Sequence, residues 1–109
     1  MYYPLSALLI ECLILSIVKE HDSYGYDISQ TIKQVASIKE STLYPILKRL
    51  EQAGYLTTYS QAYNNRTRKY YALTDAGEKQ LLYLQNEWRE YRDAIDRIIE
   101  GSEHHDEGL

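Results

Sequence analysis

Residues 41–73 constrain the fold of this chain more than any other stretch, because a short helical segment leads directly into two β-prone runs. The helical segment carries apolar residues at the spacing of one helix face: Leu43, Ile46, Leu47 and Leu50. Ser41 can cap its start, and Pro45 is expected in its first turn, since a deeper proline costs about 3 kcal/mol. Gly54 follows Ala53, where it can end the helix in the left-handed conformation.

A β-hairpin is expected directly after this helix. Tyr55–Ser60 and Lys69–Leu73 are rich in Tyr and Thr, which strands favour. Gln61–Arg68 lies between them and is polar. Within it Asn64-Asn65 is the expected turn, because Asn tolerates the left-handed region. A helix followed by such a hairpin is the pattern of a recognition helix and a wing.

Two further helices are expected before this unit. Leu5–Lys19 is apolar on most sides, which predicts a helix buried centrally. A polar break follows at His21–Ser23, where Asp22 or Ser23 can cap the next helix. That helix is expected over Tyr24–Val35, with Ile28, Ile32 and Val35 facing inward, and Ala36–Glu40 then acts as a linker.

The last third of the chain predicts one long helix. Thr74 or Asp75 can cap it, Glu78 completes a capping box with Asp75, and it is expected to end near Ile99. Its apolar residues form a heptad stripe: Leu81, Leu84, Trp88, Tyr91, Ile95 and Ile98. The stripe is short for an autonomous coiled coil, so we expect it to pair across a homodimer with help from the N-terminal helix. The alternative is packing on its own domain only, which we disfavour because the wing domain is expected to close its core without this helix.

Charge is distributed unevenly, although the net charge is −4. Residues 1–74 carry eight basic and six acidic side chains, whereas residues 75–109 carry four and ten. Five of those eight basic residues fall in the helix and hairpin, where only Glu51 opposes them: Lys48, Arg49, Arg66, Arg68 and Lys69. A helix of this size fits the DNA major groove, and a basic hairpin can reach the neighbouring backbone. Double-stranded DNA is therefore the predicted partner.

The predicted fold is mainly α with a small β-hairpin (α+β): a winged helix-turn-helix plus a long C-terminal dimerisation helix. We assign residues 1–74 to a winged-helix DNA-binding domain, 75–100 to the dimerisation helix and 101–109 to a flexible tail. The overall acidity leaves one alternative open, a winged-helix protein-interaction module without sequence-specific DNA binding. A DNA titration with a steep salt dependence would separate the two.

Several other classes of protein are disfavoured. Leu5–Val18 is interrupted by Glu11 and too short to span a bilayer, and it lacks the cationic start of a signal peptide, so no membrane is expected as a partner. The single Cys12 gives no disulfide framework and is favoured as a buried hydrophobe, which is compatible with a cytoplasmic protein. The sequence holds no nucleophile–base set and no glycine-rich phosphate loop, and His104-His105 alone makes no metal site. We expect no enzyme activity, cofactor or metal.

Five short motifs are each weak alone but form a specific signal in this order and at these spacings: Tyr24-Gly25-Tyr26-Asp27-Ile28, Ser41–Glu51, Gly54-Tyr55-Leu56, Arg68-Lys69-Tyr70-Tyr71 and Leu73-Thr74-Asp75-Ala76-Gly77. With these motifs the chain resembles the PadR family of bacterial transcriptional regulators, over roughly residues 5–100, and its single C-terminal helix looks like the short-tailed branch. The resemblance implies a dimeric winged helix-turn-helix, usually a repressor, released in some members by phenolic acids or other small aromatics. The wing tip departs from the glycine-rich tip of many relatives, which changes its expected reach into the groove.

The predicted DNA contacts on the recognition helix begin at its amino end. Ser41 and Thr42 can bind a phosphate oxygen or a base edge there. Lys48 lies one turn further and can reach guanine or phosphate. Arg49 is a further candidate, with a solvated surface charge as the alternative. Tyr44 matches a tyrosine of the family, so the resemblance implies that Tyr44 contacts DNA. The alternative is that Tyr44 is an aromatic residue of the core.

The remaining predicted contacts are on the wing and at the start of the second helix. Arg66, Arg68 and Lys69 are expected to meet phosphates, or to put one guanidinium into the minor groove. Tyr24 is either a phosphate contact or a packing tyrosine. Lys48→Ala is expected to change sequence preference, and Arg68→Ala to weaken all sequences and lower the salt slope by about one. A two-fold dimer predicts an inverted-repeat operator with half-sites ~10 base pairs apart.

Trp88 is the only tryptophan and lies in the middle of the heptad stripe. In some members of the family a tryptophan at this place lines a cleft for aromatic drugs, so the resemblance implies a small aromatic ligand near Trp88. The alternative is plain packing in the interface.

Overall fold

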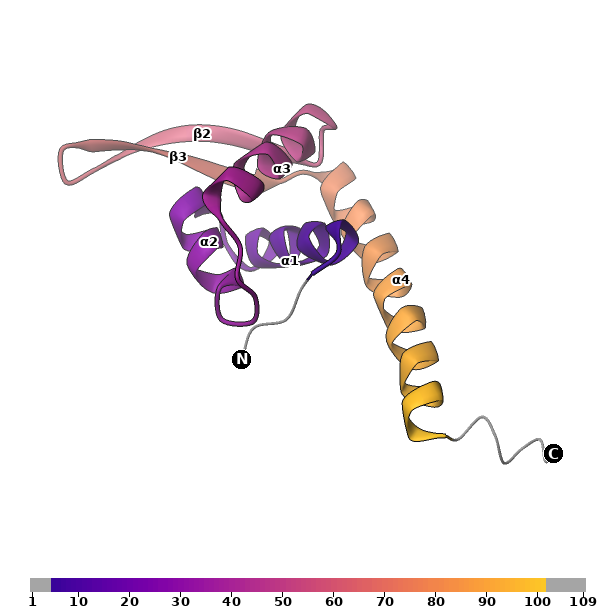
Figure 1. The fold of residues 1–109 in the computed structure, drawn as a ribbon. Helices are drawn as coiled ribbons and strands as arrows, with labels where there is room; N and C mark the ends of the chain where they lie inside the picture. The colour runs from indigo at the N-terminus through magenta and orange to yellow at the C-terminus, as the bar shows by residue number, and fades with distance from the viewer. Residues whose placement is uncertain (1–4, 102–109) are drawn as a thin grey trace.

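The computed structural model describes residues 5–101 as four helices and a three-stranded antiparallel sheet, which confirms the α+β fold. The elements are α1 (Ala7–Glu20), β1 (Ser23–Tyr24), α2 (Gly25–Ile32), α3 (Glu40–Gln52), β2 (Leu56–Tyr63), β3 (Arg66–Leu73) and α4 (Asp75–Glu100). Apart from Gly101, the predicted flexible tail lies outside the described residues, as does His104-His105. In Figure 1 α1 lies at the centre, the β2–β3 hairpin extends to one side and α4 runs down the other. No helix within the described part of the chain is long and apolar enough to cross a bilayer.

The hairpin turns at Asn64-Asn65, as predicted, but its strands are longer than expected. Both asparagines have positive φ values, 49° and 63°, as a two-residue turn matched to the strand twist requires. The ladder therefore runs to the tip, where Tyr63 pairs with Arg66. The polar composition of residues 61–68 does not prevent this, because cross-strand pairing rather than burial holds the distal wing together.

A short third strand, β1, was not predicted and shifts the start of α2. Ser23 pairs with Tyr71, and Tyr24 pairs with Tyr70 on β3. The prediction that Asp22 or Ser23 caps α2 is wrong, because Ser23 is a buried strand residue whose hydroxyl donates to the His21 carbonyl at 2.9 Å. Tyr24 occupies the cap position instead, and its side chain makes no capping hydrogen bond to the helix backbone.

The predicted end of α2 is also wrong. The helix stops at Ile32 and turns over residues 33–35, so the helical spacing that placed Val35 inward does not continue. Val35 is 47% exposed, whereas Ala36 is buried in the same core cluster as Ile28 and Ile32.

α3 begins two residues earlier than predicted, because its cap is Lys39 rather than Ser41, so Pro45 lies inside the helix rather than in its first turn. Lys39, not Ser41, is the cap residue, and its carbonyl accepts the amides of Thr42 and Leu43 at 2.9 and 3.0 Å. Proline has no N–H to give to the Ser41 carbonyl one turn back. Ser41 and Pro45 both face solvent, where water can satisfy that carbonyl.

The inner stripe and the stop of α3 are as predicted. All four stripe residues are buried: Leu43, Ile46, Leu47 and Leu50. Gly54 has φ 87°, and the amides of Gly54 and Tyr55 donate to the carbonyls of Glu51 and Leu50, each at 3.0 Å. These two bonds close the helix end in a Schellman motif.

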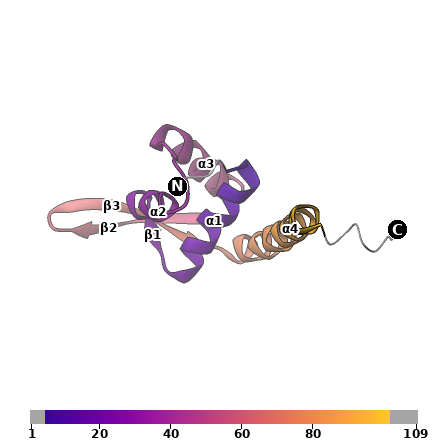
Figure 2. The same cartoon turned by 60° about the horizontal axis from the view of Figure 1, so that its bottom comes forward.

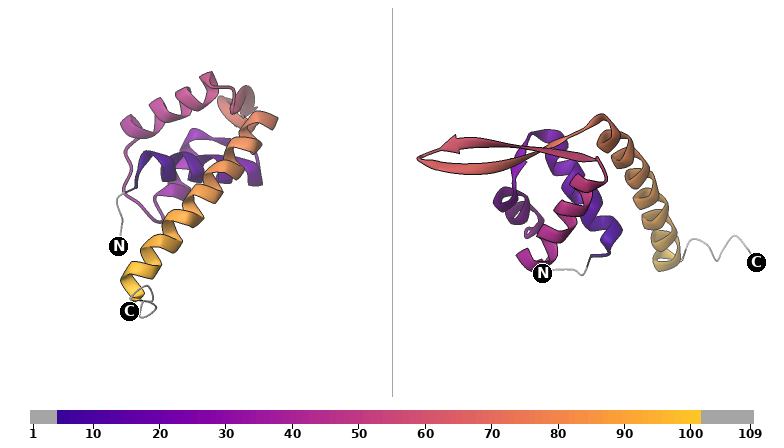
Figure 3. Two further views of the ribbon diagram at one scale, coloured as in Figure 1. Left: turned by 90° about the vertical axis from the view of Figure 1, so that its right-hand side faces the viewer. Right: turned by 90° about the horizontal axis from the view of Figure 1, so that it is seen from above.

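α4 completes the core of the wing domain, which corrects the expectation that this core closes without it. Leu81 and Leu84 are 1% and 3% exposed and belong to the same cluster as Ile14 and Leu15 of α1. α4 runs alongside α1, and its second half stands clear of the other elements in Figures 2 and 3. The helix is therefore a core element at its start and an open surface at its end.

The start of α4 is fixed by Thr74, one of the two caps predicted. Its hydroxyl accepts the Gly77 amide at 2.9 Å and donates to the Gly54 carbonyl at 2.6 Å, which ties α4 to the end of α3. The predicted capping box does not form, because with Thr74 as the cap the third helical residue is Gly77. Glu78 instead pairs with Lys19 of α1 at 2.5 Å.

Candidate nucleic-acid interface

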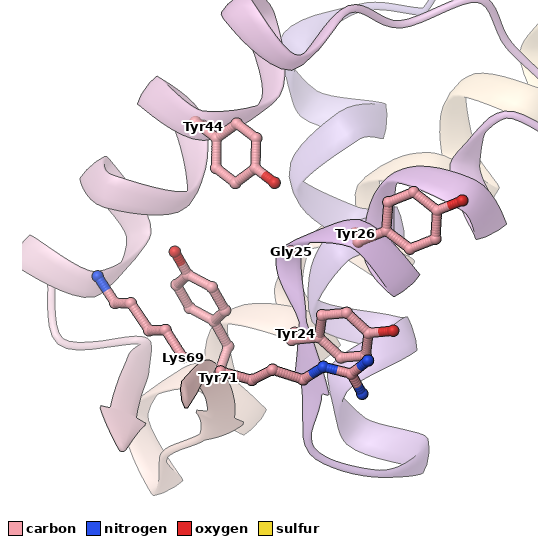
Figure 4. Close-up of a pocket in the computed structure, with 7 residues that line it drawn as sticks. Tyr24, Gly25, Tyr26, Tyr44, Lys69 and Tyr71 are labelled. Atoms are coloured by element: carbon pink, nitrogen blue, oxygen red, sulfur yellow. The ribbon is translucent and has the colours of Figure 1, made fainter. Parts of the chain in front are cut away.

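The start of α2, the outer face of α3 and the root of the wing meet around a cavity of about 380 Å³. Its walls come from all three elements: Tyr24, Gly25, Tyr26, Tyr44, Arg68, Lys69 and Tyr71. Figure 4 shows the hydroxyls of Tyr44 and Tyr71 pointing into the space between α3 and α2. Tyr71 is only 6% exposed, and burial raises the pKa of its hydroxyl.

Tyr44 packs on α2 and is also accessible. Its ring lies against Gly25, where a β-carbon would come within 2.7 Å of Tyr44 Cε1. The side chain nevertheless stays 43% exposed. The two interpretations of Tyr44, packing aromatic and DNA contact, are therefore compatible, because one edge of the ring packs while the rest faces outward.

The outer face of α3 presents Ser41, Thr42 and Lys48, which are all exposed. The Lys48 side chain has no ion-pair, hydrogen-bond or ring partner among residues 5–101. Arg49 is also exposed, but it forms an ion pair with Glu11 of α1. Of the two α3 cations, the structure therefore leaves Lys48 available and engages Arg49 within the molecule.

One face of the wing carries a row of tyrosines across its three strands. Tyr70 on the middle strand stacks with Tyr59 of β2 at 5.6 Å and meets Tyr24 of β1 edge-on, also at 5.6 Å. The Tyr59 hydroxyl donates to the Asp22 carboxylate at 2.7 Å, and this bond raises the pKa of Tyr59. The row ties the root of the wing to the loop before β1.

The three wing cations differ in their surroundings. The Arg68 guanidinium lies over the Tyr24 ring at 4.3 Å and over the Tyr63 ring at 4.1 Å. Lys69 pairs with Glu51 of α3 at 3.5 Å. Arg66, next to the turn, is exposed and its side chain has no partner in the part of the chain that the structure describes. A hydrogen bond with Tyr70 further raises the pKa of Arg68, so it is a permanent cation.

The predicted dimer residues divide into two groups along α4. Leu81 and Leu84 are buried within the chain, whereas Trp88 and Ile95 are half-buried and Tyr91 and Ile98 are 57% and 70% exposed. The rings of Trp88 and Tyr91 lie 6.2 Å apart. A cavity of about 330 Å³ opens beside them, between the start of α1 and α4, and its lining includes Tyr91 and Glu87.

Sequence reasoning missed several residues of this surface. Tyr26, Gly25 and Tyr63 contribute to it through packing that joins distant segments. One signal was available, because the chain has twelve tyrosines and no phenylalanine. Tyr59 and Tyr63 also alternate along one strand with Gln61 between them, which places all three on the same face.

Known proteins resemble this chain in sequence and in structure. Residues 14–82 match the family described as "Transcriptional regulator PadR-like family". The crystal structure of smu.1704 from Streptococcus mutans UA159 is 71% identical with a TM-score of 0.89, over 93% of this chain and 95% of that one. A PadR family transcription regulator from Clostridium difficile R20291 is 32% identical with a TM-score of 0.76, over 83% and 97%. The negative transcriptional regulator PadR of Bacillus subtilis (strain 168) is 32% identical over 78 residues, which are 67% of this chain but only 43% of that regulator.

Proposed function

The chain belongs to the PadR-like family of transcriptional regulators, whose members are not enzymes, and from this premise we propose a sequence-specific DNA-binding regulator that acts as a homodimer. The observation that carries the proposal is a pair of exposed cations whose side chains have no partner within residues 5–101, Lys48 on α3 and Arg66 on the wing. They lie on two different elements of one winged-helix unit. Such a unit places its helix in the major groove and its wing on the adjacent backbone.

Apart from Arg68, each remaining site residue has a proposed part in this docking. Ser41 and Thr42 meet a phosphate or base edge at the start of α3, because both side chains are exposed there. Tyr24 and Tyr44 contact the backbone beside the cavity between α2 and α3. Arg49 and Lys69 contribute less, since each already has a carboxylate partner.

The second half of α4 supports the homodimer. Tyr91, Ile98 and Ile99 are 57%, 70% and 76% exposed, which is a large apolar surface for one helix. Pairing with a second copy buries this surface together with Trp88 and Ile95. We therefore divide the chain by proposed role: the winged-helix unit of residues 1–74 binds DNA, and residues 75–100 hold the two copies together. A symmetric pair of such units fits an inverted-repeat operator.

A repressor acting in the cytoplasm is the mode of regulation we propose. The Bacillus subtilis relative, whose full length this chain does not span, is named a negative regulator. Release by a small aromatic ligand stays a prediction from the family resemblance. The cavity between α1 and α4 is where we would look for it, because Tyr91 lines it and Trp88 lies 6.2 Å from that ring. Quenching of Trp88 fluorescence by phenolic acids, with a shift in melting temperature, is the result expected there.

Selection of genomic DNA fragments at two salt concentrations tests the function. Recovery of a palindromic motif is expected, with retention falling steeply as salt rises. Retention of DNA fragments that share no motif would mean that the protein binds only the DNA backbone and not a specific sequence. No retention at either salt would favour the protein-interaction module, whose support is the net charge of −4.

A further inference from the structure

The five cations of α3 and the wing are not equivalent. Three of them are engaged within the molecule: Arg49 with Glu11, Lys69 with Glu51, and Arg68 with the rings of Tyr24 and Tyr63. Lys48 and Arg66 have no side-chain partner among the described residues. Arg68 stands out among the engaged three, because aromatic rings rather than a carboxylate hold it and its charge is not neutralised.

The sheet places Arg68 between its two rings. The strand order is β1-β3-β2, so Tyr24 on β1 and Tyr63 on β2 approach β3 from opposite sides. The ring centroids lie 4.3 and 4.1 Å from the Arg68 guanidinium carbon. Both distances are well within the range of a cation–π contact. Through Arg68, the distal wing at Tyr63 is joined to the strand that opens α2.

This packing conflicts with insertion of Arg68 into DNA. With two tyrosine rings within 4.3 Å of its central carbon, the Arg68 guanidinium is part of a cluster that is too bulky for a minor groove about 6 Å wide. Withdrawing Arg68 from the rings would forfeit both cation–π contacts. Arg66 has no such constraint: it is exposed, it lies beside the turn, and with Tyr24 and Tyr26 it lines a cavity of about 420 Å³ between the wing and α2.

We propose that Arg68 is a positioning residue that holds the wing against the start of α2 through Tyr24 and Tyr63, and that Arg66 is the wing cation that meets DNA. This inference rests on the proposed function for its DNA half. It differs from the expectation that Arg68→Ala removes a phosphate contact. Arg68 supplies a planar, delocalised guanidinium that reaches two rings at once, and not a charge alone, so lysine replaces it only in part.

Paired substitutions at the two arginines separate the roles. The probes are a random-sequence 30-base-pair duplex and the duplex most enriched by genomic selection. Arg66→Ala is expected to lower the salt slope of binding by about one for each bound copy, and Arg66→Lys to restore it. Arg68→Ala is expected to weaken binding by about tenfold because it loses both ring contacts, and Arg68→Lys is expected to weaken it too, because a compact ammonium is a poorer partner than a planar guanidinium for two rings at once. Full affinity in Arg68→Lys would show a point charge on phosphate and overturn the proposal.

Amide hydrogen exchange of the free protein tests the positioning role without DNA. Wing amides are expected to exchange about tenfold faster in both Arg68 variants and in Tyr63→Ala, but not in Tyr63→Phe or either Arg66 variant. Unchanged exchange in Arg68→Ala would overturn the proposal. If the wild-type protein binds neither duplex at about 50 mM salt, the proposed function fails, and the exchange experiment still decides the role of Arg68.

Discussion

Two glycines in close contact with neighbouring residues are expected to tolerate a methyl group very differently. A β-carbon at Gly25 would meet the tip of the Tyr44 side chain at 2.7 Å, and that side chain is free to swing outward. A β-carbon at Gly77 would meet the Tyr55 carbonyl oxygen at 2.1 Å, and this is backbone held at the end of α3. We therefore expect Gly77→Ala to lower the free energy of unfolding by about 3 kcal/mol. Gly25→Ala should change it by less than about 1 kcal/mol, as measured by urea denaturation.

The same Gly25→Ala variant is expected to weaken DNA binding, because it displaces the Tyr44 ring from its place on α2. A double-mutant cycle with Tyr44→Ala separates this effect from damage to the helix. If Gly25 acts only by seating Tyr44, then Gly25→Ala should cause no further loss once Tyr44 is alanine. An additive loss would assign Gly25 a direct role, such as close approach of the backbone to phosphate.

Tyr71 makes stability sensitive to alkaline pH. Burial raises its pKa above the ordinary value of 10.0, so the unfolded chain releases this proton more readily than the folded one. The stability linked to Tyr71 is therefore complete below about pH 10 and is lost as the pH rises through the folded-state pKa. Tyr71→Phe keeps the ring without the proton. Its melting temperature should fall less than that of the wild type between about pH 9 and 11, and an equal fall would contradict this assignment.

At the scale of elements, the features predicted correctly are those that a few neighbouring residues determine. The four inward residues of α3, its stop at Gly54 and the turn at Asn64-Asn65 each depend on local spacing or on one backbone conformation. Strand β1 and the start of α2 depend instead on pairing between Ser23 and Tyr71, far apart in the chain. Glu11, which pairs with Arg49, and Tyr24, which lies against Arg68, are also remote in sequence, so the sequence alone cannot show which cations stay available.

The turn of the wing gives a prediction for an element as a whole. Asn65 has φ 63°, a conformation that costs a residue such as alanine about 1 kcal/mol and glycine almost nothing. Asn65→Ala is expected to speed amide exchange at the wing tip about fivefold, whereas Asn65→Gly should leave it unchanged. Similar exchange in both variants would mean that the cross-strand pairs, and not the turn, set the stability of the wing.

At the scale of the whole molecule, α4 has two different roles along its length. Its first turns seal the winged-helix core through Leu81 and Leu84, so α4 and α1 share one packed core. Its later turns expose the surface that we assign to the second copy. In the proposed homodimer, a change at the contact between the copies would alter the spacing of the two proposed DNA-binding faces, because α4 connects that contact to the winged-helix core.

This arrangement predicts that dimer contacts can be removed without unfolding the chain. Ile98 is 70% exposed, so Ile98→Glu should leave the fold intact while it removes ~2 kcal/mol of apolar burial from each copy. Together the substitutions in the two copies should raise the dimer dissociation constant about a thousandfold, as measured by analytical ultracentrifugation.

Leu82→Glu is the matched control, because Leu82 is 57% exposed on the same helix but lies outside the stripe. A dimer that survives Ile98→Glu, or fails equally in Leu82→Glu, would place the interface elsewhere. A monomeric variant should still bind one half-site weakly, which separates the contribution of each copy to DNA affinity from that of their pairing.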